Sequence, residues 1–231
     1  MTLPLRELRD GLARFGPHGV RVNSIGTTNT EVGDLASPNA TGLGLNSSGV
    51  GTFELVNLGD VKAKTGASLN SESIAAGVTN WLRPEDGAWS KDGKTFYFVT
   101  TATATSASRL WALEFTNPAN PEAGGTVKML LNGSEGQMML DNMTVADDGS
   151  ILLQEDPGGN DRLAKIWSYN VTTNKLTELA QHDPALFTGA NKLTNIAAPA
   201  ANTDASTKKY VDDAISSLVN GAGPALDTLK E

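Results

Sequence analysis

The sequence contains no cysteine, which excludes disulfide bonds, thiolate metal sites and a cysteine nucleophile. It also lacks a run of about 18 apolar residues, the length that a membrane-spanning helix needs. The N-terminal segment MTLPLRELRDGLARFG carries charges between its apolar residues, so it does not fit a secretory signal. Basic residues are outnumbered, with 18 Lys and Arg against 26 Asp and Glu, and the net charge is -8. Because nucleic-acid binding depends on clustered Lys and Arg, we expect no nucleic-acid partner.

Aromatic residues are scarce, at 6%, whereas glycine is frequent, with 24 residues among 231. This composition is typical of a turn-rich protein built from β-strands rather than of a helical bundle. The length and the 39% hydrophobic content suffice for one or two domains with a buried core. We therefore expect a mainly β protein.

Two stretches of the sequence share an Asp-Gly turn that is followed by a strand-like run. They are SKDGKTFYFVTT, from Ser90 to Thr101, and ADDGSILLQEDP, from Ala146 to Pro157. Their Asp-Gly pairs lie 56 residues apart (148 − 92), and the same separation relates Trp111 to Trp167 (167 − 111). The shared spacing indicates two copies of one structural unit.

Each copy is expected to hold an entry acid and a series of short strands. The entry acids, Glu85-Asp86 and Asp141-Asn142, again lie 56 residues apart (141 − 85). The expected strands are Phe96–Thr100 and Ile151–Gln154, then Arg109–Phe115 and Lys165–Val171, and last Thr126–Leu131 and Lys175–Ala180. Repeats of four short strands are typical of propeller blades. Two blades cannot close a propeller, which needs about four to eight. The chain therefore borrows blades, is a fragment or folds differently.

The C-terminal segment has the pattern of an amphipathic helix. Asp204 or Ser206 can cap its start, and Gly221 can end it. Its apolar stripe consists of Tyr210, Val211, Ala214, Ile215, Leu218 and Val219. A helix of about four turns is marginal alone, so the stripe needs a partner. Self-association as a coiled coil is the favoured interpretation, and packing on the rest of the chain is the alternative.

The segment KLTNIAAPAANTDASTKKYVDDAISSLVNGAGPALDTLKE, residues 192–231, resembles a segment common in bacteriophage tail fibres. Such proteins are homotrimers, so the resemblance implies a homotrimer. It also implies a location in the virion, after synthesis in the host cytoplasm, with other virion proteins as partners.

Residues from about Phe53 to Phe187 resemble part of the PhoX-type alkaline phosphatases. The motifs that carry this resemblance include VTNWLRPEDGAW, RLWALEF and LLQEDPGGNDRLAKIWSYN. The family implies a six-bladed propeller with calcium and iron at its axis. It places acidic ligands at Glu85 and Glu155, with Asp156 as a further candidate. The family's metal-binding cysteine is absent here, as are its other blades.

The acids Glu85, Asp141, Glu155 and Asp156 occupy corresponding strand ends and could gather at one mouth of a propeller. Clustered carboxylates suit Ca²⁺, so calcium is the cation predicted there, although no cofactor is required. The alternative is that these acids form turns or hydrogen bonds between blades. Trp111 and Trp167 are expected in the blade core. Trp81 and Trp89 are candidates for stacking on a host-surface glycan, with core packing as the alternative.

Taken together, the sequence predicts residues 1–50 as an irregular attachment region, 51–188 as propeller-type blades and 189–231 as a fibre-type linker with a trimerising helix. Three chains with two blades each would close a six-bladed ring. We expect a tail-fibre or appendage component that acts in host attachment or tail assembly. A metal-dependent phosphoesterase and a glycan-binding fibre module are the alternatives.

Overall fold

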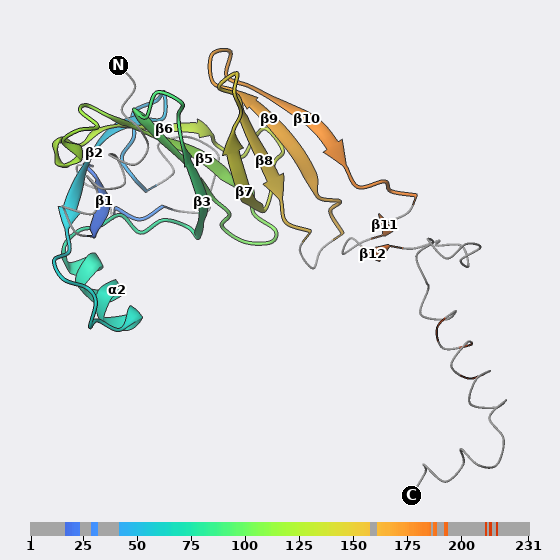
Figure 1. Cartoon of the computed structure of the whole chain (residues 1–231), viewed down its shortest axis with the longest axis horizontal. Coiled ribbons are helices and arrows are strands. Elements are labelled where there is room, and N and C mark those ends of the chain that lie inside the picture. Colours follow the sequence, from blue (N-terminus) through green and yellow to red (C-terminus); the bar gives the residue numbers. More distant parts are fainter. Residues whose placement is uncertain are drawn as a thin grey trace, which may run out of the picture.

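The computed structural model describes residues 17–23, 29–31, 42–157, 161–185, 187–188 and 192–193, together with Val211, Asp213 and Ser216. Within these residues the protein is mainly β, which confirms the expected fold class at that level. Figure 1 shows two antiparallel sheets side by side, with helix α2 (Gly66–Ala75) projecting from the end of the first sheet. None of the helices in this part of the chain is long and apolar enough to cross a membrane.

The first sheet has six strands in the order β1-β2-β6-β5-β4-β3 and curls along its width (Figure 1). Its strands are β1 (His18–Val22), β2 (Val50–Asn57), β3 (Pro84–Trp89), β4 (Thr95–Thr100), β5 (Arg109–Phe115) and β6 (Gly125–Leu131). A short 3-10 helix, η2 (Pro121–Ala123), precedes β6. All neighbouring strands in this sheet pair antiparallel.

The second sheet has four strands in the order β10-β9-β8-β7. Its strands are β7 (Leu140–Val145), β8 (Ile151–Glu155), β9 (Lys165–Asn170) and β10 (Lys175–Gln181). A two-stranded pairing of β11 (Phe187–Thr188) with β12 (Lys192–Leu193) follows it. Each strand of the second sheet is thus connected to the next along the chain, as are β3 to β6 of the first sheet.

The strands β3–β6 and β7–β10 form the same meander, which confirms the repeat at the level of strand order. Each meander has a register shift between its first two strands and another between its last two, at matching places. Arg83 and Met139, which precede β3 and β7, both adopt a left-handed backbone conformation, with φ of 56° and 51°. Bulges and left-handed residues are specific local features, so their recurrence indicates repetition of the whole unit.

The two Asp-Gly turns are equivalent but differ in length by one residue. The amide of Ser90 donates to the carbonyl of Thr95, whereas the amide of Ala146 donates to the carbonyl of Ser150. Trp111 pairs with Phe98, and Trp167 pairs with Leu153, so β4 and β8 correspond with a separation of 55 residues (153 − 98). The constant spacing of 56 expected from the sequence therefore fails within this strand, because the second turn is shorter.

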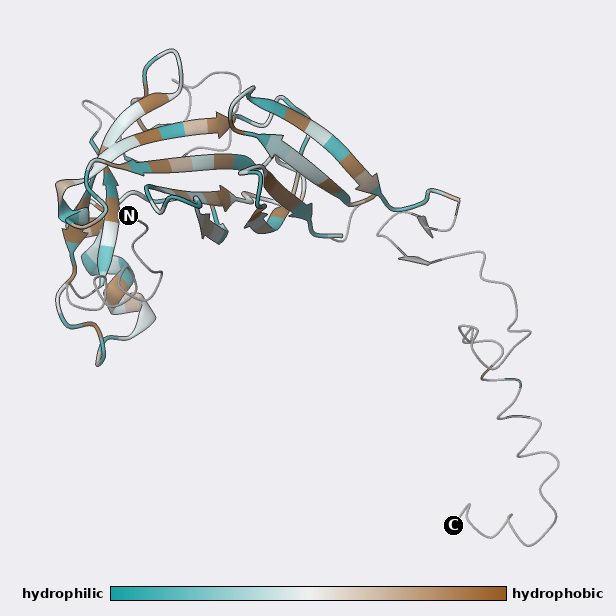
Figure 2. Ribbon diagram, turned by 45° about the horizontal axis from the view of Figure 1, so that its top comes forward, coloured by the Kyte–Doolittle hydropathy of each residue, from teal (hydrophilic) through white to brown (hydrophobic). Residues whose placement is uncertain are grey.

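Alternating side chains along the strands divide each sheet into two faces (Figure 2). The core between the sheets contains Val99, Leu110 and Leu131 from the first sheet, and Leu153 and Trp167 from the second. A second core lies on the opposite face of the first sheet and includes Trp111. Both repeat tryptophans are buried, as expected.

The second core is completed by residues that the sequence assigned to an irregular attachment region. Val22, Leu43 and Leu45 are buried there against Phe98 and neighbouring side chains of the first sheet. Strand β1 also pairs with β2 over its whole length. The described parts of residues 1–50 therefore belong to the β structure, and the expected boundary at residue 50 is misplaced. Long-range pairing and burial of this kind leave no local sequence pattern.

Most of the predicted trimerising stripe lies outside the described residues. Of its six members only Val211 is described, and Val211, Asp213 and Ser216 are helical and exposed. This agrees with a helix at these positions, whereas the coiled coil stays a prediction.

Candidate functional site

A groove of about 480 Å³ lies on the concave side of the first sheet. Its walls come from β3 to β5 on one side and from β1 and β2 on the other. Aromatic rings dominate the lining, through Trp81, Trp89, Phe96, Phe98 and Phe115. The sheet forms the groove because it curls, so that His18 and Val20 of β1 take part in the same lining as β3.

The aromatic rings of the groove meet one another at several angles. The ring of Trp81 packs at 83° to Phe98, with centroids 4.9 Å apart. The ring of Trp89 lies between Phe96 and Phe115, at centroid distances of 5.2 and 5.4 Å. Trp81, Trp89, Phe96 and Phe115 are only partly buried. The structure thus brings the two predicted glycan-stacking residues into one groove, although both also pack against other rings.

Glu85 and Asp86 lie at the β3 side of the groove. Glu85 is paired with Arg83 at 2.5 Å from the guanidinium Nε, and 28% of its side chain is exposed. Asp86 is committed to the backbone, because its Oδ1 accepts from the amide of Gly87 and its Oδ2 from the amide of Met143 in β7. Asp86 therefore forms a hydrogen bond between the two sheets, as the alternative interpretation of this acid expected.

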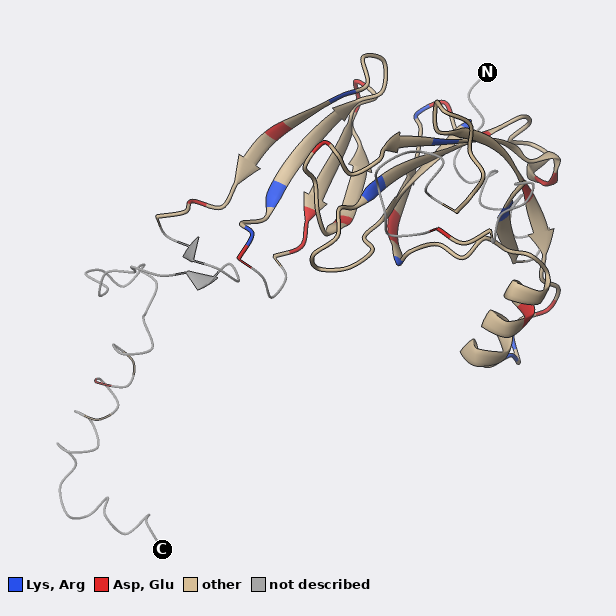
Figure 3. Cartoon of the chain, turned by 180° about the vertical axis from the view of Figure 1, so that it is seen from behind, with Lys and Arg blue, Asp and Glu red and all other residues tan. Residues whose placement is uncertain are grey.

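Asp141 lies next to these acids and interacts electrostatically with Asp156, Glu85 and Asp86. Partial burial and then the charges of Asp156 and Glu85 raise the pKa of the Asp141 carboxyl, and Arg83 opposes this shift. Figure 3 shows acidic segments of both sheets along one margin of the molecule. The structure thus brings together three of the four predicted cation ligands, namely Glu85, Asp141 and Asp156.

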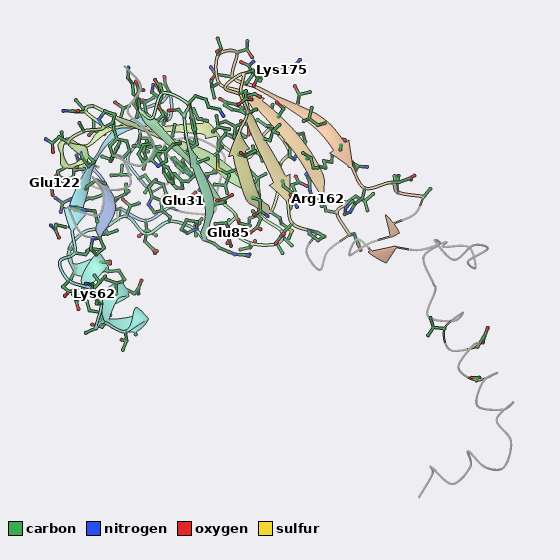
Figure 4. All side chains as sticks on the ribbon, viewed as in Figure 1. Glu31, Lys62, Glu85, Glu122, Arg162 and Lys175 are labelled. Carbon is green, nitrogen blue, oxygen red and sulfur yellow. The ribbon has the colours of Figure 1, made fainter. Side chains whose placement is uncertain are left out.

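The fourth predicted ligand, Glu155, is buried and already engaged. Its carboxylate accepts hydrogen bonds from the amides of Met138 and Lys165, at 2.9 and 3.2 Å, and from the indole of Trp167, at 2.9 Å. It also pairs with Arg162, whose Nε lies 2.8 Å from Oε2. Figure 4 labels Arg162 beside the second sheet. A carboxylate with this set of donors does not fit a metal ligand, because both of its oxygens already accept several hydrogen bonds.

No group of three or more Asp, Glu, His or Cys side chains is placed to hold a metal ion in the part of the chain that the structure describes. The pair of Glu155 and Arg162 argues against the predicted role of Glu155. A calcium site at Glu85, Asp141 and Asp156 stays a prediction.

A second buried ion pair, between Glu31 and Arg109, was not expected from the sequence. Both side chains are almost fully buried, at 1% and 2% exposure, and Nη1 of Arg109 lies 2.6 Å from Oε1 of Glu31. Glu31 also accepts from the hydroxyl of Thr100 and from the amide of Leu82. The one available signal was Arg109 itself, a charged residue at the start of the apolar strand RLWALEF. Nothing local pointed to Glu31 (labelled in Figure 4) as its partner.

Comparison with solved structures gives a likeness in fold. The structure of Pseudomonas fluorescens PhoX in complex with vanadate, a transition state analogue, matches 70% of this chain with a TM-score of 0.50 and 9% sequence identity. The chain is similar to part of PhoX. It covers 34% of the length of the PhoX chain, and at this identity the match concerns the fold alone. No protein-family model matches the sequence, and no curated protein matches it.

Proposed function

We propose that this chain is a structural protein rather than an enzyme, and that it acts as a subunit of a homotrimeric tail fibre or appendage. The observation that carries this proposal is the use of the acids in the two motifs that resemble PhoX. Asp86 bonds to backbone amides of both sheets, and Glu155 pairs with Arg162. These acids hold strands together, which is what a scaffold requires and what a metal-dependent reaction would prevent. A role in host attachment or tail assembly within a virion follows from the fibre-type C-terminal segment.

The two meanders are proposed to be blades of the propeller type. Their adjacent first strands support this, since Asp86 of β3 reaches Met143 of β7. A six-bladed ring made by three chains meets an obstacle, because Leu43 and Leu45 of the same chain pack on the face that a neighbouring blade would cover. We therefore propose that residues 210–219, rather than closure of a ring, hold the trimer together.

The mass of the protein in solution tests this assembly. We expect three times the chain mass of 24.1 kDa by sedimentation or mass photometry. Ile215→Asp places a charge in the apolar stripe and should reduce the mass to that of one chain. Ser216→Asp changes an exposed residue outside the stripe and serves as the matched control. A single-chain mass for the unaltered protein would refute the trimer.

A metal-dependent phosphoesterase is the second candidate, and the likeness in fold to PhoX favours it. A chromogenic phosphate ester, incubated with the protein and with Ca²⁺ or iron, tests this function. We expect no turnover above the blank, because Glu155 is engaged by Arg162. Turnover that the substitution Glu155→Gln abolishes would replace the structural proposal with the enzymatic one.

A further inference from the structure

The groove of the first sheet combines aromatic walls with negative charge. Its ionisable lining residues are His18, Glu85 and Asp86, and no Lys or Arg is among the described residues that line it. Asp141 and Asp156 add negative charge close to Glu85. Arg83, which pairs with Glu85, is the positive group at this end. On the opposite side, Glu122 lies 3.1 Å from the Nε2 of His18 (Glu122 and Glu85 are labelled in Figure 4). An anionic ligand would therefore be repelled from this groove.

Hydrogen-bonding capacity in the groove is low. Both oxygens of Asp86 already accept backbone amides, and Oε1 of Glu85 is held by Arg83. A sugar carries several hydroxyl groups that need partners when they leave water. A primary ammonium group likewise carries three N–H donors. The groove offers too few free acceptors for either, so its ligand must bind through surface and charge.

We propose that this groove binds a methylated ammonium group, such as the trimethylammonium group of choline. Such a cation has no N–H to satisfy and is attracted to the faces of aromatic rings. Trp89 and Phe115 stand at 36° to each other, and Trp81 and Phe98 form a second, nearly perpendicular pair. Glu85 supplies the negative charge at the margin of these rings. The volume of about 480 Å³ falls within the range of small-ligand sites. The site lies in the first sheet and does not depend on trimerisation.

Choline and its neutral carbon analogue, 3,3-dimethylbutan-1-ol, test this site by calorimetry and by tryptophan fluorescence on the full chain. We expect choline to bind at least about fivefold more tightly than the neutral analogue, which lacks the cation–π attraction. Trp89→Leu keeps an apolar side chain but removes the ring, and should weaken choline binding by about tenfold. Equal binding of both compounds would overturn the proposal, and so would binding of a glycan panel without choline.

Glu85→Gln keeps the shape of the side chain, removes its charge and leaves the rings in place. We expect weaker choline binding, most clearly at low salt. Glu178→Gln is the matched control, because Glu178 is likewise paired with a basic residue, Lys165, but lies on the second sheet. An equal effect of the two substitutions would overturn the role of Glu85.

Vesicles of phosphatidylcholine and soluble phosphocholine distinguish the source of the group. Co-sedimentation with vesicles would identify a lipid headgroup, and binding of soluble phosphocholine alone would identify a soluble or polymer-borne group. No binding of choline, phosphocholine or vesicles at millimolar concentration would overturn the proposal. The mass measurement described above is independent, so the trimer and the ligand site stand or fall separately.

Discussion

In the first sheet the indole N–H of Trp111 donates to the hydroxyl of Thr100, and that hydroxyl donates in turn to Glu31. In the second sheet the indole N–H of Trp167 donates directly to Glu155. Thr100 and Glu155 occupy corresponding positions, since each is the partner of the first residue of the preceding strand. The same tryptophan thus reaches a buried carboxylate in both sheets, once through a hydroxyl and once directly.

The difference lies in where the carboxylate and its arginine come from. In the second sheet both are local, because Arg162 lies seven residues after Glu155. In the first sheet Glu31 comes from a segment 78 residues away from Arg109. The first pair therefore fastens residues 29–31 to the sheet, whereas the second fastens a loop to its own strand. The same chemical device serves long-range closure in one sheet and local order in the other.

The largest effect is expected from breaking the pair in the first sheet. Arg109→Met leaves Glu31 buried without its cation, and should lower the free energy of unfolding by about 3–5 kcal/mol. Chemical denaturation followed by circular dichroism measures this change. Arg21→Met removes one partner of the exposed pair of Arg21 and Glu54 and should cost at most about 1 kcal/mol. Equal midpoints for Arg109→Met and the unaltered protein would contradict the role assigned to Glu31.

Breaking the second pair should cost less. Glu155→Gln keeps an oxygen that can accept from Trp167, and Arg162 is 23% exposed and can turn to water. We expect a loss of about 1–3 kcal/mol in the free energy of unfolding, from the same denaturation measurement. The control is Glu114→Gln, which alters an exposed pair with Lys128. A loss larger than that of Arg109→Met would reverse the order proposed for the two sheets.

The contact between the sheets ranks third. Asp86→Ala removes the acceptor for the amide of Met143, and should cost about 1–2 kcal/mol. Hydrogen exchange at the Met143 amide should become faster, which reports directly on the lost bond. Asn142→Ala is a close control, because Asn142 occupies the corresponding position in the second sheet and its side chain bonds to its exposed neighbour Asp141. Unchanged exchange at Met143 in Asp86→Ala would show that the bond does not protect it.

The repeat could be predicted from the sequence because its landmarks are local. Asp-Gly requires a turn, and in both copies the Asp side chain accepts the amide two residues later, from Lys94 and Ser150. The one-residue difference between the turns was missed, because aligned landmarks before and after the strand hide a compensating shift. The pairing of β2 with β6 was also missed, since Val50 and Lys128 are partners only through tertiary structure.

The candidate site was predicted in part. Equivalent strand ends correctly brought Glu85, Asp141 and Asp156 together, because repeated units place corresponding residues on one margin. Glu155 was assigned with them, although its position in β8 turns it toward Arg162 and Trp167. The aromatic groove had only Trp81 and Trp89 as sequence signals. Its other wall depends on β1, whose pairing could not be read from local pattern.

The smallest effect concerns two acids whose pKa values shift in opposite directions. Asp141 has a raised pKa, through burial and the charges of Asp156 and Glu85, so its ionised form is less favourable in the folded protein. Asp141→Asn should therefore be slightly more stable than the unaltered protein at neutral pH, by less than about 1 kcal/mol. The difference should vanish as the pH falls through the raised pKa to below about 3.9, where the carboxyl is protonated in both states.

Asp148 sets the opposite case, because hydrogen bonds from Ser150 lower its pKa. Asp148→Asn should be less stable than the unaltered protein at neutral pH, and this deficit should disappear as the pH falls below the ordinary carboxyl range, because Asp148 is then protonated in both the folded and unfolded states. Urea denaturation at pH 7 and at pH 3.5 measures both variants. Added Ca²⁺ extends the test to the predicted cation site, since calcium bound there would stabilise the unaltered protein and not Asp141→Asn. If both substitutions shift stability with the same sign at pH 7, repulsion among Glu85, Asp141 and Asp156 is not what raises the pKa of Asp141.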